Sequence, residues 1–173
     1  MDERQRAGFL VALVGSLAEG GFVGKTHVQK TVYFAQEAAG VNLGFRFVIH
    51  HYGPYSFELD SMVQTLEAEG VLAITPEPDG YGYRISPGLN SGELEIASSL
   101  RSRAEHIAGY FAGLQAVDLE LLSTALYVRR RLPDTDEGTW IGETRRLKPK
   151  FTEAKISEAL KEAAGIAAEL ASS

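Results

Sequence analysis

Residues 50–60 read HHYGPYSFELD, and this stretch places a turn directly before a helix. Gly53 allows backbone angles that are closed to other residues, Pro54 fixes φ, and Ser56 stands where a helix N-cap belongs. Apolar residues then follow at helical spacing until Gly70 ends the run. We therefore predict structural roles for the three turn residues and a helix that begins after them.

Two helices and a short strand are predicted before this turn. The apolar spacing near the N-terminus predicts a helix over residues of about 4–19. A second helix is predicted from Thr26, which can act as its N-cap, to a stop at Gly40. Residues 45–52, FRFVIHHY, are rich in β-branched and aromatic types, so we predict a strand that ends at a turn formed by Gly53 and Pro54.

A β-hairpin is predicted after the third helix, because VLAIT and YGYRI flank the pair Asp79–Gly80. From Ser91 onward the pattern is helical. The further predicted helices cover residues of about 92–113, about 117–132, a short stretch around Trp140, and about 152–171.

The order helix, helix, strand, helix, hairpin is that of a winged helix. We predict a mainly α (α+β) protein with two parts. Residues 1–90 form a winged-helix-like N-terminal domain with a β-hairpin wing. Residues 91–173 form a C-terminal helical extension that packs on it, and the composition shifts between the parts near SPGLNSG.

Four stretches carry a family resemblance: VQKTVYFAQEAAG, HHYGPYSFELDSMVQTLEAEGVL, LELLSTALYVRRR and KPKFTEAKISEAL. Together they resemble the YwgA-like uncharacterised prokaryotic family over residues of about 25–165, and the Tyr-Gly-Pro-Tyr-Ser turn is the most specific part. More remotely, the layout resembles Panacea (SocA-like) antitoxin domains. His51 departs from the pattern, which has an aromatic or apolar residue there. The resemblance implies a fold more than an activity.

Composition excludes several classes of protein. The chain has 173 residues, a formal net charge of −6 and no cysteine. The negative charge gives no general attraction for nucleic acid or anionic membranes. The absence of cysteine removes disulfides and thiolate metal sites and fits a cytoplasmic location. The first apolar run is too short to span a bilayer, so we expect a core helix there and no membrane partner.

Polar and aromatic residues are expected to converge at the turn. The apolar face of the second helix leaves Gln29 and Lys30 pointing toward the strand end. Tyr52 and Tyr55 are each expected to place a ring in the core and a hydroxyl near this pair, with His50 beside them. Such a cluster is typical of a binding site, and a structural hydrogen-bond network gives the same pattern, so both interpretations stay open.

The neighbouring histidines argue against a metal site. Adjacent side chains on a strand point to opposite faces, so His50 and His51 cannot both bind one ion. Alternation with Phe45 and Phe47 predicts that His51 is a core residue and that His50 is exposed or functional. We predict no metal and no cofactor. An enzyme with a site near His27, Lys30 and His50 is an alternative, although we expect a protein that is not an enzyme.

The predicted third helix is acidic, because residues 56–70 contain four carboxylates and no Lys or Arg. This composition disfavours binding in a DNA groove. A candidate basic patch lies elsewhere and comprises Arg129, Arg130, Arg131, Arg145, Arg146, Lys148 and Lys150. These cations are typical of solvated helix ends, or they anchor an acidic protein or RNA.

The sequence thus predicts a non-catalytic, cytosolic interaction or regulatory module of an antitoxin-like kind, with a protein partner or a second copy of the chain as its ligand. Besides the enzyme, the alternative is a nucleic-acid-binding transcriptional regulator that uses the basic segment 129–150.

Overall fold

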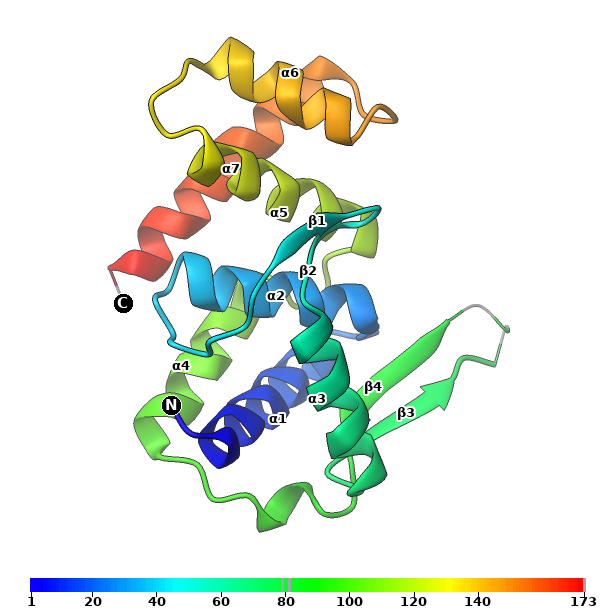
Figure 1. The fold of residues 1–173 in the computed structure, drawn as a ribbon. Helices are drawn as coiled ribbons and strands as arrows, with labels where there is room; N and C mark the ends of the chain where they lie inside the picture. The colour runs from blue at the N-terminus through cyan, green and yellow to red at the C-terminus, as the bar shows by residue number, and fades with distance from the viewer. Residues whose placement is uncertain (79, 81, 173) are drawn as a thin grey trace.

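Helices make up most of the computed structural model, which describes residues 1–78, 80 and 82–172 (Figure 1). In chain order the elements are α1 (Glu3–Glu19), α2 (Lys25–Glu37), β1 (Val48–His50), β2 (Gly53–Tyr55), α3 (Phe57–Ala68), β3 (Leu72–Pro76), β4 (Tyr83–Pro87), the 3₁₀ helix η1 (Ser91–Glu93), α4 (Ser98–Gly109), α5 (Ala116–Arg131), α6 (Glu137–Leu147) and α7 (Glu153–Ala171). The strands form two small antiparallel hairpins, β1–β2 and β3–β4, so the mainly helical α+β class is confirmed.

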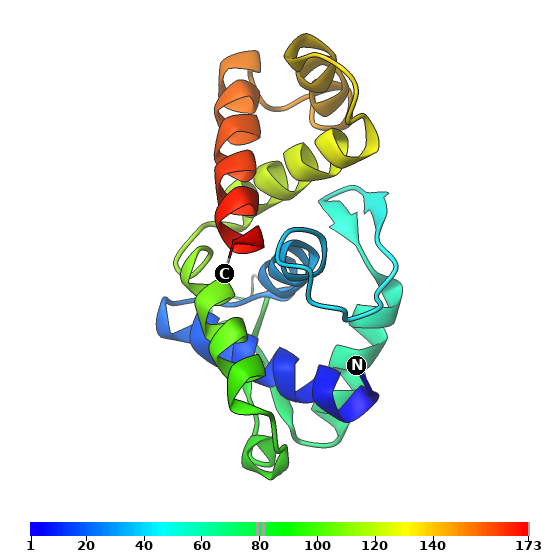
Figure 2. The same cartoon turned by 90° about the vertical axis from the view of Figure 1, so that its left-hand side faces the viewer.

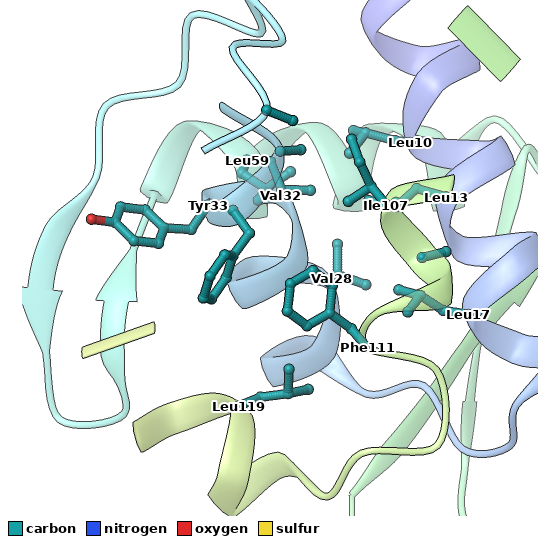
Figure 3. Close-up of a cluster of buried hydrophobic side chains, with 14 of the residues drawn as sticks. Leu10, Leu13, Leu17, Val28, Val32, Tyr33, Leu59, Ile107, Phe111 and Leu119 are labelled. Carbon is teal, nitrogen blue, oxygen red and sulfur yellow. The ribbon is translucent and has the colours of Figure 1, made fainter. Parts of the chain in front are cut away.

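One hydrophobic core joins the two halves of the chain. α1 packs against α4, and α2 lies between α4 and α5 (Figure 1). Figure 3 shows side chains from these helices and from the segment after α4 meeting around α2, among them Leu13, Val28, Ile107 and Phe111, which are all buried. The core therefore continues across residue 90, where the domain boundary stays a prediction.

The helix starts follow from local capping. The predicted cap of α3 is confirmed, because the Ser56 hydroxyl accepts a hydrogen bond from the Leu59 amide at 3.2 Å. The predicted cap of α2 is wrong: the N-cap is Gly24, and Thr26 lies inside the first turn. The Gly24 amide donates to Nδ1 of His27 at 3.1 Å, so the histidine at the third helical position takes the place that Glu or Gln fills in a capping box.

The strand predicted over residues 45–52 is shorter in the structure, and the turn lies elsewhere. β1 pairs antiparallel with β2, with Val48 opposite Tyr55 and His50 opposite Gly53. The two-residue turn is therefore His51–Tyr52, and the predicted turn at Gly53 and Pro54 is wrong because both belong to β2. Pro54 can lie in this strand since a two-stranded hairpin consists only of edge strands.

The remaining elements follow the sequence pattern with one break. The β3–β4 hairpin is confirmed and projects from the body beside α3 (Figure 1); Asp79 of its predicted turn lies outside the described residues. The helix predicted over residues of about 92–113 is wrong at its start, because η1 and an extended segment precede α4. α5, α6 and α7 are confirmed and lie together at one end of the molecule (Figure 2). No helix in the described part of the chain is long and apolar enough to cross a membrane.

Candidate functional site

A cavity of about 340 Å³ lies between α2 and the β1–β2 hairpin. The five residues that the sequence predicts to converge all line it: Gln29, Lys30, His50, Tyr52 and Tyr55. Sequence reasoning missed its other lining side chains, which are Lys25, Thr26 and Phe57, and it assigned Gly53 only a structural role. The cavity is therefore the candidate site of the molecule.

Two buried side chains of α2 hold the backbone of the hairpin. The Gln29 amide donates to the carbonyl of Ser56 at 3.0 Å and accepts from its N–H at 2.9 Å. The Lys30 ammonium donates to the carbonyl of Pro54 at 2.7 Å. Both side chains therefore satisfy backbone groups of β2 and the α3 cap, whereas the sequence led us to expect tyrosine hydroxyls as their partners.

The two tyrosines lie farther from the core than predicted. Tyr52 is at the tip of the hairpin and is 63% exposed, because the turn includes it. Tyr55 is half-buried, and burial together with a hydrogen bond to Asp60 raises the pKa of its hydroxyl to about 12. The prediction that both rings are core residues is wrong. The rings instead form part of the cavity wall and its rim.

His50, at the end of β1, and His51, in the turn, are both exposed. His50 is exposed as predicted, but His51 is not a core residue, because it occupies the turn and no longer follows the strand alternation. The His50 ring lies 5.4 Å from the Tyr55 ring, and the Tyr55 ring lies 5.1 Å from that of Phe57. These three rings form a continuous aromatic wall along the cavity.

A buried ion-pair cluster supports the hairpin from the side of α5. The Glu120 carboxylate forms ion pairs with the ammonium groups of Lys148 and Lys150, each at 2.9 Å. The Lys148 ammonium also donates to the backbone carbonyl of His51. The side chains of Glu120 and Lys148 are only 5% and 3% exposed. Burial acts to raise the pKa of the Glu120 carboxyl, but the two lysines outweigh it and hold this pKa below its usual value.

Lys30 lies close to this cluster and has an unusual protonation equilibrium. Its side chain is buried, with 1% of the residue exposed. Burial, with a smaller contribution from the charge of Lys148, lowers the pKa of Lys30 to about 8, and Glu120 offsets part of this effect. A cation that is so largely removed from water is a feature of functional sites and of structural ion-pair networks alike.

Gly53 brings the hairpin close to α5. Its φ is +88°, and a Cβ at this position would lie 2.8 Å from Oγ1 of Thr124. No other residue type fits both the angle and the space without strain. The predicted structural role of Gly53 thus has a specific cause, which is the approach of β2 to the helix that carries Glu120.

The candidate basic patch is divided in the structure. Lys148 is buried and therefore not part of an exposed surface. Several of the other cations lie near carboxylates or aromatic rings. The contacts are Arg130 with Glu37, Arg145 with Glu153, Arg146 with Glu143, Lys150 with Glu120, Arg129 with the ring of Trp140, and Arg131 with the ring of Tyr127. These contacts reduce the positive field that a polyanion would meet.

The alternative enzyme site is not brought together. His27 lines a second cavity, of about 500 Å³, whereas Lys30 and His50 line the first. Nδ1 of His27 accepts from Gly24, so Nε2 carries the proton and donates to the carbonyl of Leu114 at 3.0 Å. Burial lowers the pKa of His27, although the Leu114 carbonyl acts in the opposite direction. His27 therefore serves the start of α2.

Two residues of the supporting cluster were missed or misplaced by sequence reasoning. Glu120 stands between Leu119 and Leu121 in α5, and these apolar neighbours were the available signal. Lys148 was grouped with exposed cations, although it directly precedes Pro149 at the end of α6. Among the described residues, no group of three His, Asp or Glu side chains is placed to hold a metal ion.

No protein-family model matches the chain, and no curated protein matches it. The function is therefore argued from the geometry of the cavity and its surroundings.

Proposed function

We propose that this protein is a non-catalytic interaction or regulatory module of an antitoxin-like kind, which acts in the cytoplasm and binds a partner protein at the cavity between α2 and the β1–β2 hairpin. The observation that carries the proposal is the exposure of two large aromatic side chains at the cavity, Tyr52 at 63% and Phe57 at 62%. Val48, on strand β1 of the hairpin whose turn carries Tyr52, is 41% exposed.

Exposed aromatic side chains beside a cavity have the chemistry of an interaction hot spot. Tyrosine and other aromatic residues contribute a large contact area at a low cost in side-chain entropy, and few residues of this kind dominate many interfaces. Here Tyr52 projects from a turn, and Phe57 begins a helix that is fixed by its Ser56 cap. A partner that covers both rings would remove apolar surface from water and close the cavity.

The backbone behind these rings is pre-organised. Gln29, Lys30 and Lys148 are buried and each donates to a carbonyl of residues 51–56. A rigid hairpin loses little conformational freedom when it binds, so more of the contact energy appears as affinity. This arrangement supports recognition of a partner by a fixed surface.

The same groups give little support to catalysis. Among the described residues that line the cavity, no hydroxyl or amine is hydrogen-bonded to a histidine. Nucleophilic catalysis depends on such a pair, in which a base activates the attacking group.

For the fold we propose a winged-helix-like arrangement of α1, α2, α3 and the β3–β4 hairpin, within the YwgA-like resemblance described above. The order of these elements supports it. The acidic charge of α3 argues that this arrangement serves protein contacts, because duplex DNA would be repelled.

The test is to capture a partner from a lysate of the native host, purify it, and rebuild the complex from the two purified chains. Tyr52→Ser and Phe57→Ser should each weaken the rebuilt complex by about tenfold or more, as hot-spot substitutions do. Tyr83→Ser is the matched control, since Tyr83 is equally exposed but lies on β4, at 61%. An affinity lost in the control and kept in the other two variants would contradict the proposal, as would a complex that contains only this chain.

A further inference from the structure

Two lysines line the cavity of an acidic protein. Among the described residues, its lining contains Lys25, Lys30 and His50 and no carboxylate, although Asp60 pairs with Lys25 from outside the lining and the whole chain has a net charge of −6. The first turn of α2 also lines it through Lys25 and Thr26, and backbone amides at a helix start favour negative charge. The local field therefore favours an anion.

In the part of the chain that the structure describes, Lys30 is a cation that no carboxylate of its own neutralises. Within the described residues its ammonium makes one hydrogen bond, to the Pro54 carbonyl, and an ammonium can donate three. The nearby carboxylate, Glu120, is already shared by Lys148 and Lys150 at 2.9 Å each. Lys25, the other lysine of the lining, has its own partner in Asp60 at 2.8 Å.

We propose that this cavity binds a carboxylate carried on an aromatic or apolar body, with Lys30 as the cation that neutralises it. The inference deepens the proposed function and rests on it in one respect: the carboxylate would come from an acidic side chain or the C-terminus of the partner protein. A free carboxylic acid has the same chemistry and is the other source that the experiment must separate.

The lining selects a carboxylate over a phosphate. One surplus buried cation matches a group with a single negative charge, whereas a phosphate has close to two near neutral pH and is bound best by several donors or by arginine. The part of the lining that the structure describes contains no arginine, and the rings of Tyr55 and Phe57 offer contacts to an apolar body.

Binding is expected to be linked to a proton. The charged and titratable groups around Lys30 are Lys25 on α2, His50 on β1, Tyr55 on β2, Glu120 on α5 and Lys148 after α6. Behind them lie Asp60 on α3, which pairs with Lys25 and hydrogen-bonds Tyr55, and Lys150, which pairs with Glu120. An anion beside Lys30 favours its charged form. Because the pKa of Lys30 in the free protein is about 8, the fraction that is charged, and with it the affinity, should fall by about tenfold between pH 7 and pH 9.

The first experiment titrates the whole protein with phenylacetate, its neutral methyl ester and the phenethylammonium cation. Binding is measured by calorimetry and by the NMR chemical-shift changes of the Gln29 side-chain amide. Phenylacetate should bind saturably. The affinity of the ester should be lower by about tenfold or more, because the ester cannot make the charge-assisted contact. Above pH 8, binding should take up protons from the buffer. Equal binding of acid and ester, or no saturable binding of phenylacetate, would overturn the inference.

Lys30→Met should abolish the preference for the acid over the ester. Lys155→Met is the matched control, because Lys155 is exposed and pairs with Asp118 far from the lining. If Lys30→Met does not fold, the series of three probes and the pH dependence on the wild type decide the question. An unchanged preference in a folded Lys30→Met protein would overturn the inference.

Two further comparisons separate the sources and the two proposals. If the partner supplies the carboxylate, a short peptide with adjacent Asp and Phe should bind more tightly than phenylacetate, and its Asn analogue should bind more weakly than the Asp peptide. The reverse order would overturn the partner as the source of the carboxylate and leave a free acid as the source. Partner binding that is lost in Tyr52→Ser but kept in Lys30→Met would refute the carboxylate inference alone. Phenylacetate binding with partner affinity unchanged in Tyr52→Ser would refute the proposed function alone.

Discussion

Replacement of Lys30 by methionine keeps much of the side-chain length and removes a buried cation. The pKa of Lys30 in the folded protein is about 8, lowered from 10.5 mainly by burial. Between these two values the folded chain binds fewer protons than the unfolded chain, so the stability of the wild type rises with pH. The full effect is about 3 kcal/mol, at about 1.36 kcal/mol for each tenfold change, and about 2 kcal/mol of it falls between pH 7 and pH 9.5.

The variant should lack this gain. Near pH 7 it avoids the cost of the buried charge, about 3 kcal/mol, but it leaves the Pro54 carbonyl without a charged donor, which costs about 1.5–3 kcal/mol. We therefore expect the two proteins to be within about 1 kcal/mol of each other at pH 7. Relative to the variant, the wild type should gain about 2 kcal/mol as the pH rises from 7 to 9.5.

The assay is urea unfolding of both proteins at several pH values in this window, with Lys155→Met as control. The comparison stops at pH 9.5 because burial raises the pKa of Tyr33 and Tyr55, so both proteins lose stability as their unfolded tyrosines ionise above about pH 10. Parallel curves for wild type and Lys30→Met would refute the reasoning, since they would mean that Lys30 titrates alike in the folded and unfolded chains.

Four other outcomes are expected. Gly53→Val should lower the free energy of unfolding by about 2 kcal/mol or more, because φ is +88° and the new Cβ would lie 2.8 Å from Thr124 Oγ1; an unchanged urea midpoint would contradict this close approach. Ser56→Ala should cost about 1 kcal/mol through the lost cap of α3, as measured by thermal melts. Glu120→Gln should cost about 3 kcal/mol near neutral pH because Lys148 stays buried without a carboxylate. Since the folded pKa of Glu120 is depressed, the wild-type advantage is complete above the unfolded pKa and shrinks as the pH falls through the folded value, which unfolding from pH 7 down to pH 3 would reveal. Duplex DNA at moderate salt should give no sequence-specific anisotropy change, because residues 56–70 carry four carboxylates and no Lys or Arg; a tight complex with one sequence would disprove this expectation.

The helices could be predicted because their signals are local. α1, α3, α5 and α7 show apolar residues at helical spacing, and Ser56 supplies a cap that a neighbouring amide can use directly. The start of α2 shows the limit of this reasoning. Thr26 is a good cap by composition, but the N-cap is Gly24, whose amide donates to His27, and the His27 ring is fixed by a distant carbonyl, that of Leu114.

The β1–β2 hairpin could not be placed because its turn depends on tertiary contacts. A Gly-Pro pair is a strong turn signal in isolation. In the folded protein the positive φ of Gly53 serves the contact with Thr124, and the turn falls on His51 and Tyr52, which carry no turn signal of their own. His51 and Tyr52 are exposed because they form this turn.

Five of the residues that line the cavity could be predicted, whereas the roles within it could not. The helical face of α2 sufficed to direct Gln29 and Lys30 toward the turn. Which groups they bond depends on the pairing of β1 with β2, and the sequence analysis predicted no second strand there. The pairing of Glu120 with Lys148 joins α5 to the end of α6, and no local pattern links such distant positions.

Lys30 connects the stability of the hairpin to the chemistry of the cavity. Its ammonium donates to the Pro54 carbonyl, and the residue is also part of the cavity lining, so one side chain belongs to both the fold and the candidate site. A structural role alone would be met by a neutral donor, since a carbonyl needs only one N–H and burial of a cation costs free energy. An anion in the cavity would offset that cost and strengthen the bond to β2, because a fully charged donor binds a carbonyl more tightly than a neutral one. Occupation of the cavity and order of the hairpin should therefore reinforce each other, and this coupling gives a physical reason for a buried lysine where glutamine would hold the backbone as well.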